Sequence, residues 1–151
     1  MNTDDQLQIP ADPTSEEVAA QEEAERLERE RIAKENAIES AMTNVINEYA
    51  FDDTGLNDEQ KKSLDNIAEV LNNYSDLSLQ IKGHTCNIGY KSVNERVGLR
   101  RADTAKAYLV EKGISAERIS TITGGESEPI VENNSCENRK QNRRLSFTIL
   151  Q

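Results

Sequence analysis

The sequence predicts a two-layer α+β domain, in which helices cover one face of a small mixed sheet, preceded by an extended acidic helix. Charge is unevenly distributed: the 151-residue chain carries a net charge of −10, and residues 1–48, with 13 acidic and 4 basic side chains, account for −9 of it. Beyond them, strand-like and helix-like patterns follow in the order β-α-β-α-β-(α)-β, which describes a four-stranded sheet with its helices on one face. Because only 35% of the residues are hydrophobic, the core must be concentrated in this second part.

The N-terminal part divides into a leader and a linker. Residues 1–13 are polar and contain two prolines, so we expect a disordered leader. Residues 14–42 begin with a threonine and a serine followed by two glutamates, a helix-start signal, and are rich in Ala, Glu, Arg and Lys. Their apolar residues keep no steady heptad, which argues against a sustained coiled coil. We expect a charged helical linker; a helix that binds a protein partner is the alternative.

The domain is expected to span residues 43–151. The stretch "TNVINEYAF", residues 43–51, alternates as a strand does, although a helical stripe also fits part of it. Residues 58–74 predict an amphipathic helix after a turn at "DDTGLN", with one apolar face formed by Leu64, Ile67, Ala68 and Leu71. A second strand is predicted at residues 77–83, where Leu77, Leu79 and Ile81 alternate.

The remaining elements follow from the same patterns. Asn94–Lys112 predicts a second helix of the domain, ending at Gly113 as its C-cap and burying Val97, Leu99, Ala102, Ala105, Leu109 and Val110. Residues 116–124 predict a third strand with Ile119 and Ile122 buried. Residues 135–142 predict one or two helical turns, and a last strand is indicated by the alternation of Leu145, Phe147 and Ile149.

Several classes of function fit the composition poorly. The acidic balance disfavours nucleic acid as a partner. No apolar stretch approaches the length of a membrane span, and we expect no signal peptide within residues 1–30, which lack an apolar stretch flanked by positive charge. If the protein is exported, we expect contact with a membrane only through an N-terminal anchor or barrel outside this chain.

The single histidine, His84, stands beside one of two cysteines in "IKGHTCNIG". With Cys136 far away, the H-x-C pattern is not an established zinc spacing. A catalytic Cys86–His84 pair would need an orienting acid and an oxyanion hole, and the sequence identifies neither. We therefore expect no cofactor, no metal and no enzyme activity, and a structural role for His84 at the end of its strand.

A series of short motifs follows in order along the second half of the chain. They are "IKGHT" (Ile81–Thr85), Gly89, Asn94, "LRRA" (Leu99–Ala102), "YLVEKGIS" (Tyr108–Ser115), "RI" (Arg118–Ile119), "GESEPI" (Gly125–Ile130) and "NRR" (Asn142–Arg144). In this order and spacing the segment resembles the OmpA-like C-terminal domain, the peptidoglycan-associated family of Gram-negative envelopes. The resemblance covers about two-thirds of the chain, roughly residues 43–151.

The resemblance implies non-covalent binding of the diaminopimelate residue in the peptide stem of peptidoglycan. It implies a location on the periplasmic face of the outer membrane and a role in tethering that membrane, or an envelope protein, to the wall. By its place in the motifs Arg101 matches the family's ligand arginine, and a guanidinium can grip a carboxylate with two parallel hydrogen bonds. Thr85 and Asn94 match positions that line the binding loop, and Arg143 lies in the bordering "NRR" stretch.

The chain departs from the family at Cys86, where an aspartate should pair with the ammonium group of the ligand. A neutral thiol is a weak hydrogen-bond partner and offers that group no charge. Asn87 could donate a carbonyl oxygen instead, and Asp52 or Asp53 could reach over from the first strand. The alternative is an OmpA-like structural or protein-interaction module that has lost wall binding because Cys86 replaces the aspartate.

The family's topology also implies a disulfide between Cys86 and Cys136, because it places the loops that carry them at the same end of the domain. Closing a ring of about 50 residues would stabilise the protein by roughly 4 kcal/mol on the chain-entropy model. An oxidising periplasm would favour that bond. Two free thiols remain the other possibility.

Overall fold

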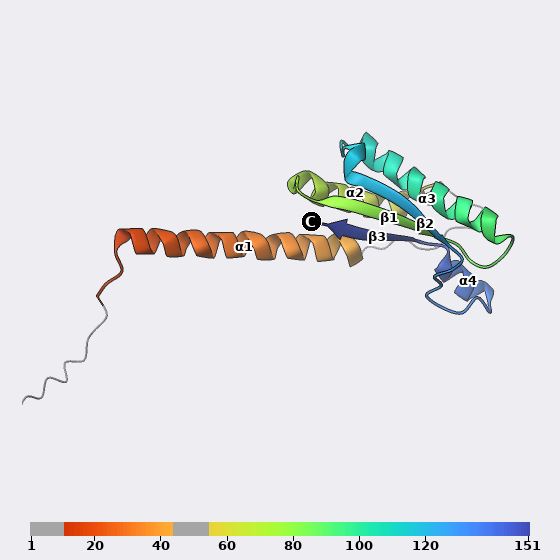
Figure 1. Cartoon of the computed structure of the whole chain (residues 1–151), viewed down its shortest axis with the longest axis horizontal. Helices are drawn as coiled ribbons and strands as arrows, with labels where there is room; N and C mark the ends of the chain where they lie inside the picture. Colours follow the sequence, from red (N-terminus) through yellow and green to blue (C-terminus); the bar gives the residue numbers. More distant parts are fainter. Residues whose placement is uncertain (1–10, 44–54) are drawn as a thin grey trace, which may run out of the picture. The chain divides into compact units, whose positions relative to one another are not determined.

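The protein, described here from a computed structural model, is defined for residues 11–43 and 55–151. Its elements in chain order are α1 (Ser15–Thr43), α2 (Asp58–Asn73), β1 (Ser78–His84), α3 (Lys91–Glu111), the 3-10 helix η1 (Ala116–Arg118), β2 (Ile119–Gly125), α4 (Cys136–Asn142) and β3 (Leu145–Leu150) (Figure 1). The chain forms two compact units, Met1–Glu35 and Asn36–Gln151.

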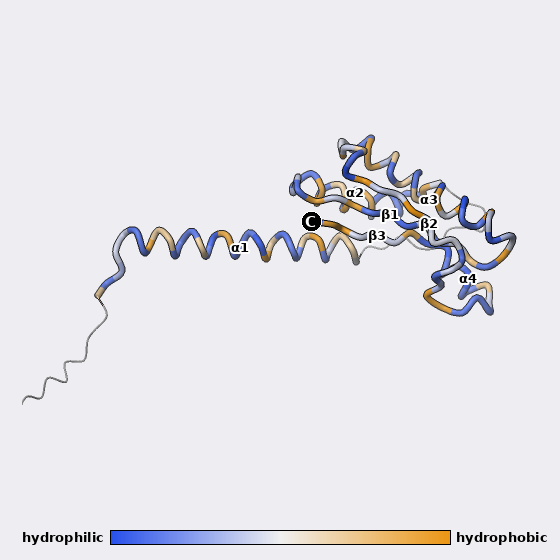
Figure 2. The backbone as a smooth tube through the Cα atoms, viewed as in Figure 1, coloured by the Kyte–Doolittle hydropathy of each residue, from blue (hydrophilic) through white to orange (hydrophobic). Residues whose placement is uncertain are grey.

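The first unit holds most of α1, and the side chains of residues 15–33 are exposed on all faces of the helix. Thr14 caps the helix, since its side chain accepts a hydrogen bond from the amide of Glu17 at 3.2 Å. The carboxylate of Glu17 in turn accepts one from the amide of Thr14. Arg26 pairs with Glu23 and Glu30, and Arg31 pairs with Glu28 and Glu35. Short hydrophobic stretches alternate with hydrophilic ones along this helix (Figure 2). The helix is therefore stabilised by composition, capping and charge rather than by a buried face.

None of the described helices is long and apolar enough to span a membrane.

The second unit begins at Asn36, within the segment that the sequence analysis assigned to the linker. Ala41 is only 3% exposed and belongs to the core of this unit. Ala37, Ile38 and Met42 pack against the same core. The last turns of α1 are thus part of the domain.

Three strands form a mixed sheet in the order β2-β1-β3 among the described residues. The central strand, β1, pairs in parallel with β2 and antiparallel with β3, so that Ile81 lies opposite both Thr121 and Phe147. The strand expected first, at residues 43–51, falls almost entirely on residues 44–54, which lie outside the described ranges. The other three strands, α2 and α4 lie close to their predicted ranges, except that residues 116–118, predicted as the start of a strand, form η1, and β2 begins at Ile119.

The core is built between the helices and one face of the sheet. Fully buried side chains of α2 and α3, such as Leu64, Leu71 and Leu109, join those of β1 and β3 in one cluster. Figure 1 shows α3 running along the sheet at β2 and β1. Ile122 is 36% exposed, so its predicted burial was wrong. It alternates with buried Ile119 and lies on the opposite face of β2.

The buried stripe of α3 differs from the predicted one. It comprises Asn94, Gly98, Arg101, Ala102, Ala105 and Leu109. Leu99 and Val110 are 36% and 40% exposed, so their predicted burial was wrong. Spacings of three and four residues place a single face toward the sheet, and that face includes an asparagine and an arginine. The helix therefore delivers two polar side chains into the interior.

Two glycines allow α3 to approach the sheet closely. A Cβ added at Gly83 of β1 would lie 1.7 Å from the carbonyl oxygen of Gly98, and one added at Gly98 would lie 2.5 Å from Oγ1 of Thr123. Helix and strand backbones are thus in direct contact. At the other end, Gly113 adopts φ +96° and completes a Schellman cap, because Ile114 donates to the carbonyl of Leu109.

Candidate functional site

The candidate site lies at the end of β1, where three segments meet. The amide of His84 donates to the carbonyl of Arg144 at 2.8 Å, and the amide of Thr85 donates to the carbonyl of Gly125 at 2.8 Å. The loop after β1 is therefore clamped between the end of β2 and the start of β3. The expectation that these loops share one end of the domain is confirmed.

Asn94 holds this loop from the first turn of α3. Its side chain is 3% exposed. Its amide nitrogen lies 3.2 Å from the carbonyl oxygen of Cys86, 3.0 Å from that of Ile88, and 3.3 Å from a carboxylate oxygen of Glu126. One NH₂ group thus ties two loop carbonyls and the neighbouring acidic loop to the helix.

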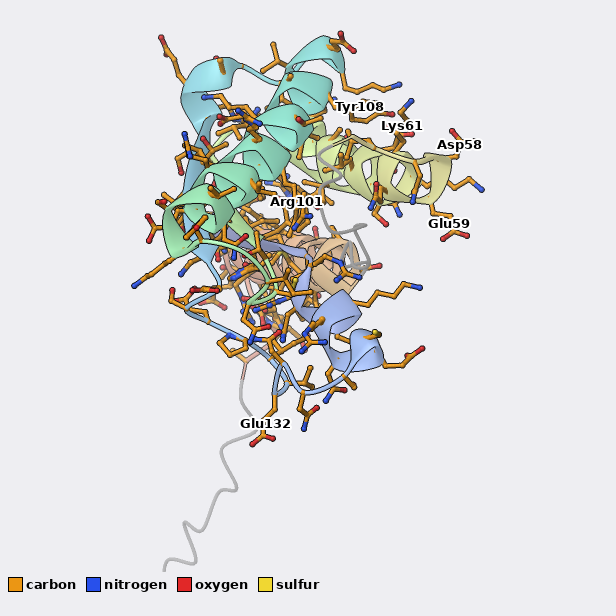
Figure 3. The ribbon with its side chains drawn as sticks, turned by 90° about the vertical axis from the view of Figure 1, so that its right-hand side faces the viewer. Asp58, Glu59, Lys61, Arg101, Tyr108 and Glu132 are labelled. Carbon is orange, nitrogen blue, oxygen red and sulfur yellow. The ribbon has the colours of Figure 1, made fainter. Side chains whose placement is uncertain are left out.

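Arg101 holds the same segment at His84, two positions before Cys86. Its side chain is 0% exposed, and Nη1 donates to the carbonyl of His84 at 2.8 Å. Figure 3 shows Arg101 in the interior of the domain, whereas Glu132 lies at the periphery. In this conformation the guanidinium is a buried cation that braces the end of β1, and it presents no surface to solvent.

Thr85 and Cys86 are also interior residues. Thr85 is 4% exposed and donates its hydroxyl to the carbonyl of Cys86 at 3.0 Å, while Cys86 is 1% exposed. Arg143 is half-buried, and its Nη1 lies 3.8 Å from Sγ of Cys86. The thiol therefore faces a cation at the position where the family resemblance places an aspartate.

Asn87 is the first exposed residue of the loop. Its side-chain carbonyl accepts a hydrogen bond from Nε of Arg139 at 3.4 Å. Arg139 and Arg143, four residues apart, thus contact two successive residues of the loop. Asp52 and Asp53, which were considered as replacements for the missing aspartate, lie outside the described residues.

The predicted disulfide is absent from this structure, where Cys86 and Cys136 are both free thiols. Cys86 is buried and Cys136 is exposed at the start of α4. The guanidinium of Arg143, rather than Cys136, lies beside the buried thiol of Cys86.

His84 occupies a dry position behind the loop. It is 3% exposed, and Nε2 pairs with the hydroxyl of Ser146 at 2.8 Å. Nδ1 has no hydrogen-bond partner and lies 3.9 Å from the carboxylate of Glu128, which pairs with Lys82. Burial lowers the pKa of His84 to about 4; the charges of Arg144 and Lys82 act in the same direction, and Glu128 opposes them. The imidazole is therefore neutral near pH 7 and has a structural role.

Two residues of the "NRR" stretch, Asn142 and Arg144, bond the backbone of loop 126–135, a role that the sequence did not indicate. Asn142 is fully buried. Its side chain accepts from the amides of Ile130 and Val131, at 2.9 and 3.3 Å, and donates to the carbonyl of Val131 at 2.8 Å. Arg144 is 8% exposed and donates to the carbonyl of Glu128 at 3.0 Å. The motif was visible in the sequence, but its role in holding loop 126–135 was not.

The polar side chains around the loop bond mainly to backbone carbonyls. Among residues 11–43 and 55–151, no three His, Cys, Asp or Glu side chains come together to hold a metal ion. His84 and Cys86 do not form a hydrogen-bonded pair in the structure, since the imidazole bonds Ser146. Fold and site together define a small α+β binding domain, whose central loop is held by buried polar side chains of the following helix.

The chain belongs to the OmpA family, whose model matches residues 48–143. The predicted fold class and the resemblance found in the sequence are both confirmed. A crystal structure of the peptidoglycan-associated lipoprotein from Burkholderia pseudomallei is similar, with a TM-score of 0.69 and 20% identity, over 73% of this chain and 93% of that chain.

Two curated relatives show the same relationship in sequence. The peptidoglycan-associated lipoprotein of Buchnera aphidicola is 33% identical over 96 residues, which is 64% of this chain and 56% of that protein. An outer membrane protein of Acinetobacter baumannii is 37% identical over 97 residues, which is 64% of this chain and 27% of that protein. The chain thus spans only part of the length of both relatives. Neither of them carries the name of an enzyme.

Proposed function

We propose that the domain binds the peptide stem of peptidoglycan without catalysis and tethers the outer membrane, or an envelope protein, to the wall. The observation that carries the proposal is a buried guanidinium, that of Arg101, beneath the loop after β1 in an OmpA-family domain. The names of the relatives support the same role on the periplasmic face of the outer membrane. The solvated helix α1 then acts as a linker, with a protein partner as a secondary possibility.

In this proposal the ligand's carboxylate pairs with Arg101, which requires residues 85–88 to open because the side chain is 0% exposed. Arg143 is half-buried and gives the carboxylate its first contact. Asn94 and Thr85 shape the loop, and Asn87 faces the ligand from its exposed position. Desolvated guanidinium–carboxylate pairs are strong, which compensates for the cost of opening.

Diaminopimelate also has an ammonium group, and Cys86 offers it no charge. The carbonyl oxygen of the Asn87 side chain is the nearest replacement, although Arg139 already donates to it. We therefore propose weak recognition of this group. An aspartate at position 86 would restore a charge-assisted hydrogen bond worth about 1.5–3 kcal/mol, or roughly tenfold to a hundredfold in affinity. The neighbouring Arg143 would offset the cost of burying that carboxylate.

Sedimentation with purified wall sacculi tests the proposal. We expect the wild type to co-sediment, Arg101→Lys to be retained less, and Cys86→Asp to be retained more. Circular dichroism of each variant shows whether it is folded. Equal retention of the wild type and a folded Arg101→Lys variant would remove Arg101 from the mechanism. No retention of the wild type would exclude wall binding.

The second candidate is an OmpA-like module that has lost wall binding and contacts another protein. The thiol of Cys86 favours it, because this residue is 1% exposed and offers no charge to the ammonium group of diaminopimelate. Calorimetric titration with a diaminopimelate-containing tripeptide separates the candidates. Saturable binding by Cys86→Asp but not by the wild type would favour this second candidate.

A further inference from the structure

His84 lies buried beside a carboxylate that is paired with another residue. Its side chain is 3% exposed, and Nδ1 has no hydrogen-bond partner among the described residues. The carboxylate of Glu128 lies 3.9 Å from this nitrogen and forms an ion pair with the ammonium group of Lys82. The side chains of Lys82 and Glu128 are 28% and 49% exposed, so solvent reaches the ion pair but not the imidazole. The proposed contacts with peptidoglycan use none of these three side chains.

The three side chains meet over Gly124. A Cβ added at this glycine would lie 2.8 Å from a carboxylate oxygen of Glu128, 3.0 Å from Nδ1 of His84 and 3.0 Å from Cε of Lys82. Lys82 and His84 stand two residues apart on β1, so their side chains share one face of the strand. Glu128 belongs to the loop after β2 and brings its carboxylate over this face. We call the three residues the latch, because they connect loop 126–135 to the sheet.

The latch is connected to the candidate site through loop 126–135. The carbonyl of Glu128 accepts a hydrogen bond from Arg144 at 3.0 Å, which holds this part of the loop against the start of β3. Two residues earlier in the loop, the carboxylate of Glu126 accepts from the side chain of Asn94 at 3.3 Å. The same Asn94 side chain bonds two carbonyls of the loop after β1. Movement of loop 126–135 would therefore also loosen the loop after β1.

A proton on His84 is unfavourable while the latch is closed. Lys82 faces the imidazole from the same strand, Glu128 from the loop after β2 and Arg144 from the start of β3. From α3, Arg101 bonds the carbonyl of His84. Burial lowers the pKa of His84 to about 4; the cations of Arg144 and Lys82 act in the same direction, and the carboxylate opposes them. When the loop lifts, water solvates the imidazole and its pKa returns to about 6.5, so proton uptake favours the open latch.

We propose that the latch is an acid-sensitive switch: protonation of His84 releases loop 126–135 from the sheet while the rest of the domain stays folded. At neutral pH the imidazole is uncharged and the loop is held in place. The ratio of open to closed latch rises as the pH falls below 6.5, and it has grown roughly tenfold to a hundredfold at pH 4.5. Acid thereby eases the opening of the loop after β1, whatever ligand that loop receives.

Amide hydrogen exchange of the full chain, followed by NMR and corrected for the intrinsic exchange rate at each pH, tests the switch. Between pH 6.5 and 4.5 we expect the protection of the Ile130 and Val131 amides, which bond Asn142, to fall roughly tenfold to a hundredfold. Low concentrations of urea should leave this local opening unchanged but accelerate exchange in the central strand, as at Ile81, where exchange requires global unfolding. His84→Gln, which takes up no proton in this range, should abolish the pH dependence of the loop.

Two variants that break the same ion pair test the charges of the latch. Lys82→Met removes a cation beside the imidazole, and Glu128→Gln removes the carboxylate that favours its protonation. We expect the first to raise the pH at which His84, the single histidine of the chain, titrates by NMR, and the second to lower it. Glu132→Gln is the matched control and should leave the titration unchanged, because this side chain lies in the same loop at the periphery of the domain (Figure 3).

Three outcomes would overturn the switch. If the loop amides show the same dependence on urea as Ile81, acid unfolds the whole domain instead of releasing the loop. A pH dependence that persists in a folded His84→Gln variant would assign the effect to another group. Shifts of the titration in the same direction for Lys82→Met and Glu128→Gln would show that loss of the ion pair, not the charge around His84, controls it. None of these measurements uses a ligand, so wall binding and the switch stand or fall separately.

Discussion

Replacing Gly83 by alanine tests how the site is built, because this glycine sets the distance between α3 and the sheet. A Cβ at this position would lie 1.7 Å from the carbonyl oxygen of Gly98, and real Cβ contacts are essentially never below 3.0 Å. Both partners are backbone, so no side chain can rotate away. The helix must recede from the strand by at least about 1.3 Å.

The loss of stability caused by Gly83→Ala depends on the side chains between α3 and the sheet. Ala102, Ala105 and Leu109 are 0% exposed and face the sheet, and they lose packing contacts as the helix moves. Arg101 is buried as well, and its 2.8 Å hydrogen bond to the carbonyl of His84 lengthens. Overpacking costs about 1–3 kcal/mol, and a weakened buried charged hydrogen bond adds about 1.5–3 kcal/mol. We expect a total of about 3–5 kcal/mol, a large fraction of the stability of a small domain.

Urea unfolding followed by tyrosine fluorescence measures this cost in the full chain, which has four tyrosines, all after residue 48, and no tryptophan. Gly113→Ala is the matched control. It has nothing within 4 Å of the added Cβ and φ +96°, so it suffers backbone strain of about 1 kcal/mol without a clash. If Gly83→Ala is no more destabilising than Gly113→Ala, close backbone contact does not set the position of the helix.

Three further predictions concern the groups around the loop. Asn142→Ala should cost about 1–3 kcal/mol, since it removes a fully buried side chain that bonds the partly buried backbone of residues 130–131; faster amide hydrogen exchange confined to that loop would accompany it, and unchanged exchange would contradict it. The pKa of His84 is about 4 in the folded protein against an ordinary 6.5, so protonation favours unfolding. The neutral, buried His84 should therefore contribute about 3 kcal/mol to the free energy of unfolding. This contribution should be complete above pH 6.5 and decline as the pH falls toward 4. His84→Gln should flatten the unfolding free energy over that range, and an unchanged pH slope would refute the assignment. A thiol reagent should modify Cys136 in the native protein and Cys86 only after unfolding, because Cys86 is 1% exposed; native labelling of neither thiol would indicate a disulfide.

Local patterns were sufficient for most of the fold. The stripe of Leu64, Ile67 and Leu71 and the alternation of Leu145 and Phe147 each follow the period of a single element, so they can be recognised without knowing what the element contacts. Burial on α3 could not be recognised in this way. Hydrophobicity favoured Leu99 and Val110, whereas the face that meets the sheet is fixed by the backbone contact of Gly98, the residue next to Leu99.

Motif spacing located the candidate site in the sequence, whereas the role of each of its residues follows from tertiary contacts. The motifs from "IKGHT" to "NRR" marked the loop, Arg101 and Asn94 as one group, because their order and spacing match a family pattern. What each group does depends on atoms brought together from distant positions. Asn142 holds a loop that begins more than ten residues before it, and the guanidinium of Arg143, not the thiol of Cys136, lies beside Cys86.

The sequence by itself therefore determined the order of the elements, the separation of an acidic helix from a neutral domain, the family, and the substitution of cysteine for the expected aspartate. These properties depend on composition, on periodicity and on motif spacing along the chain. Only the tertiary structure decided that Arg101 and Asn94 are interior braces and that His84 is dry and neutral. Burial and hydrogen bonding are properties of the packed molecule, because each depends on which distant backbone groups reach a side chain and exclude water from it.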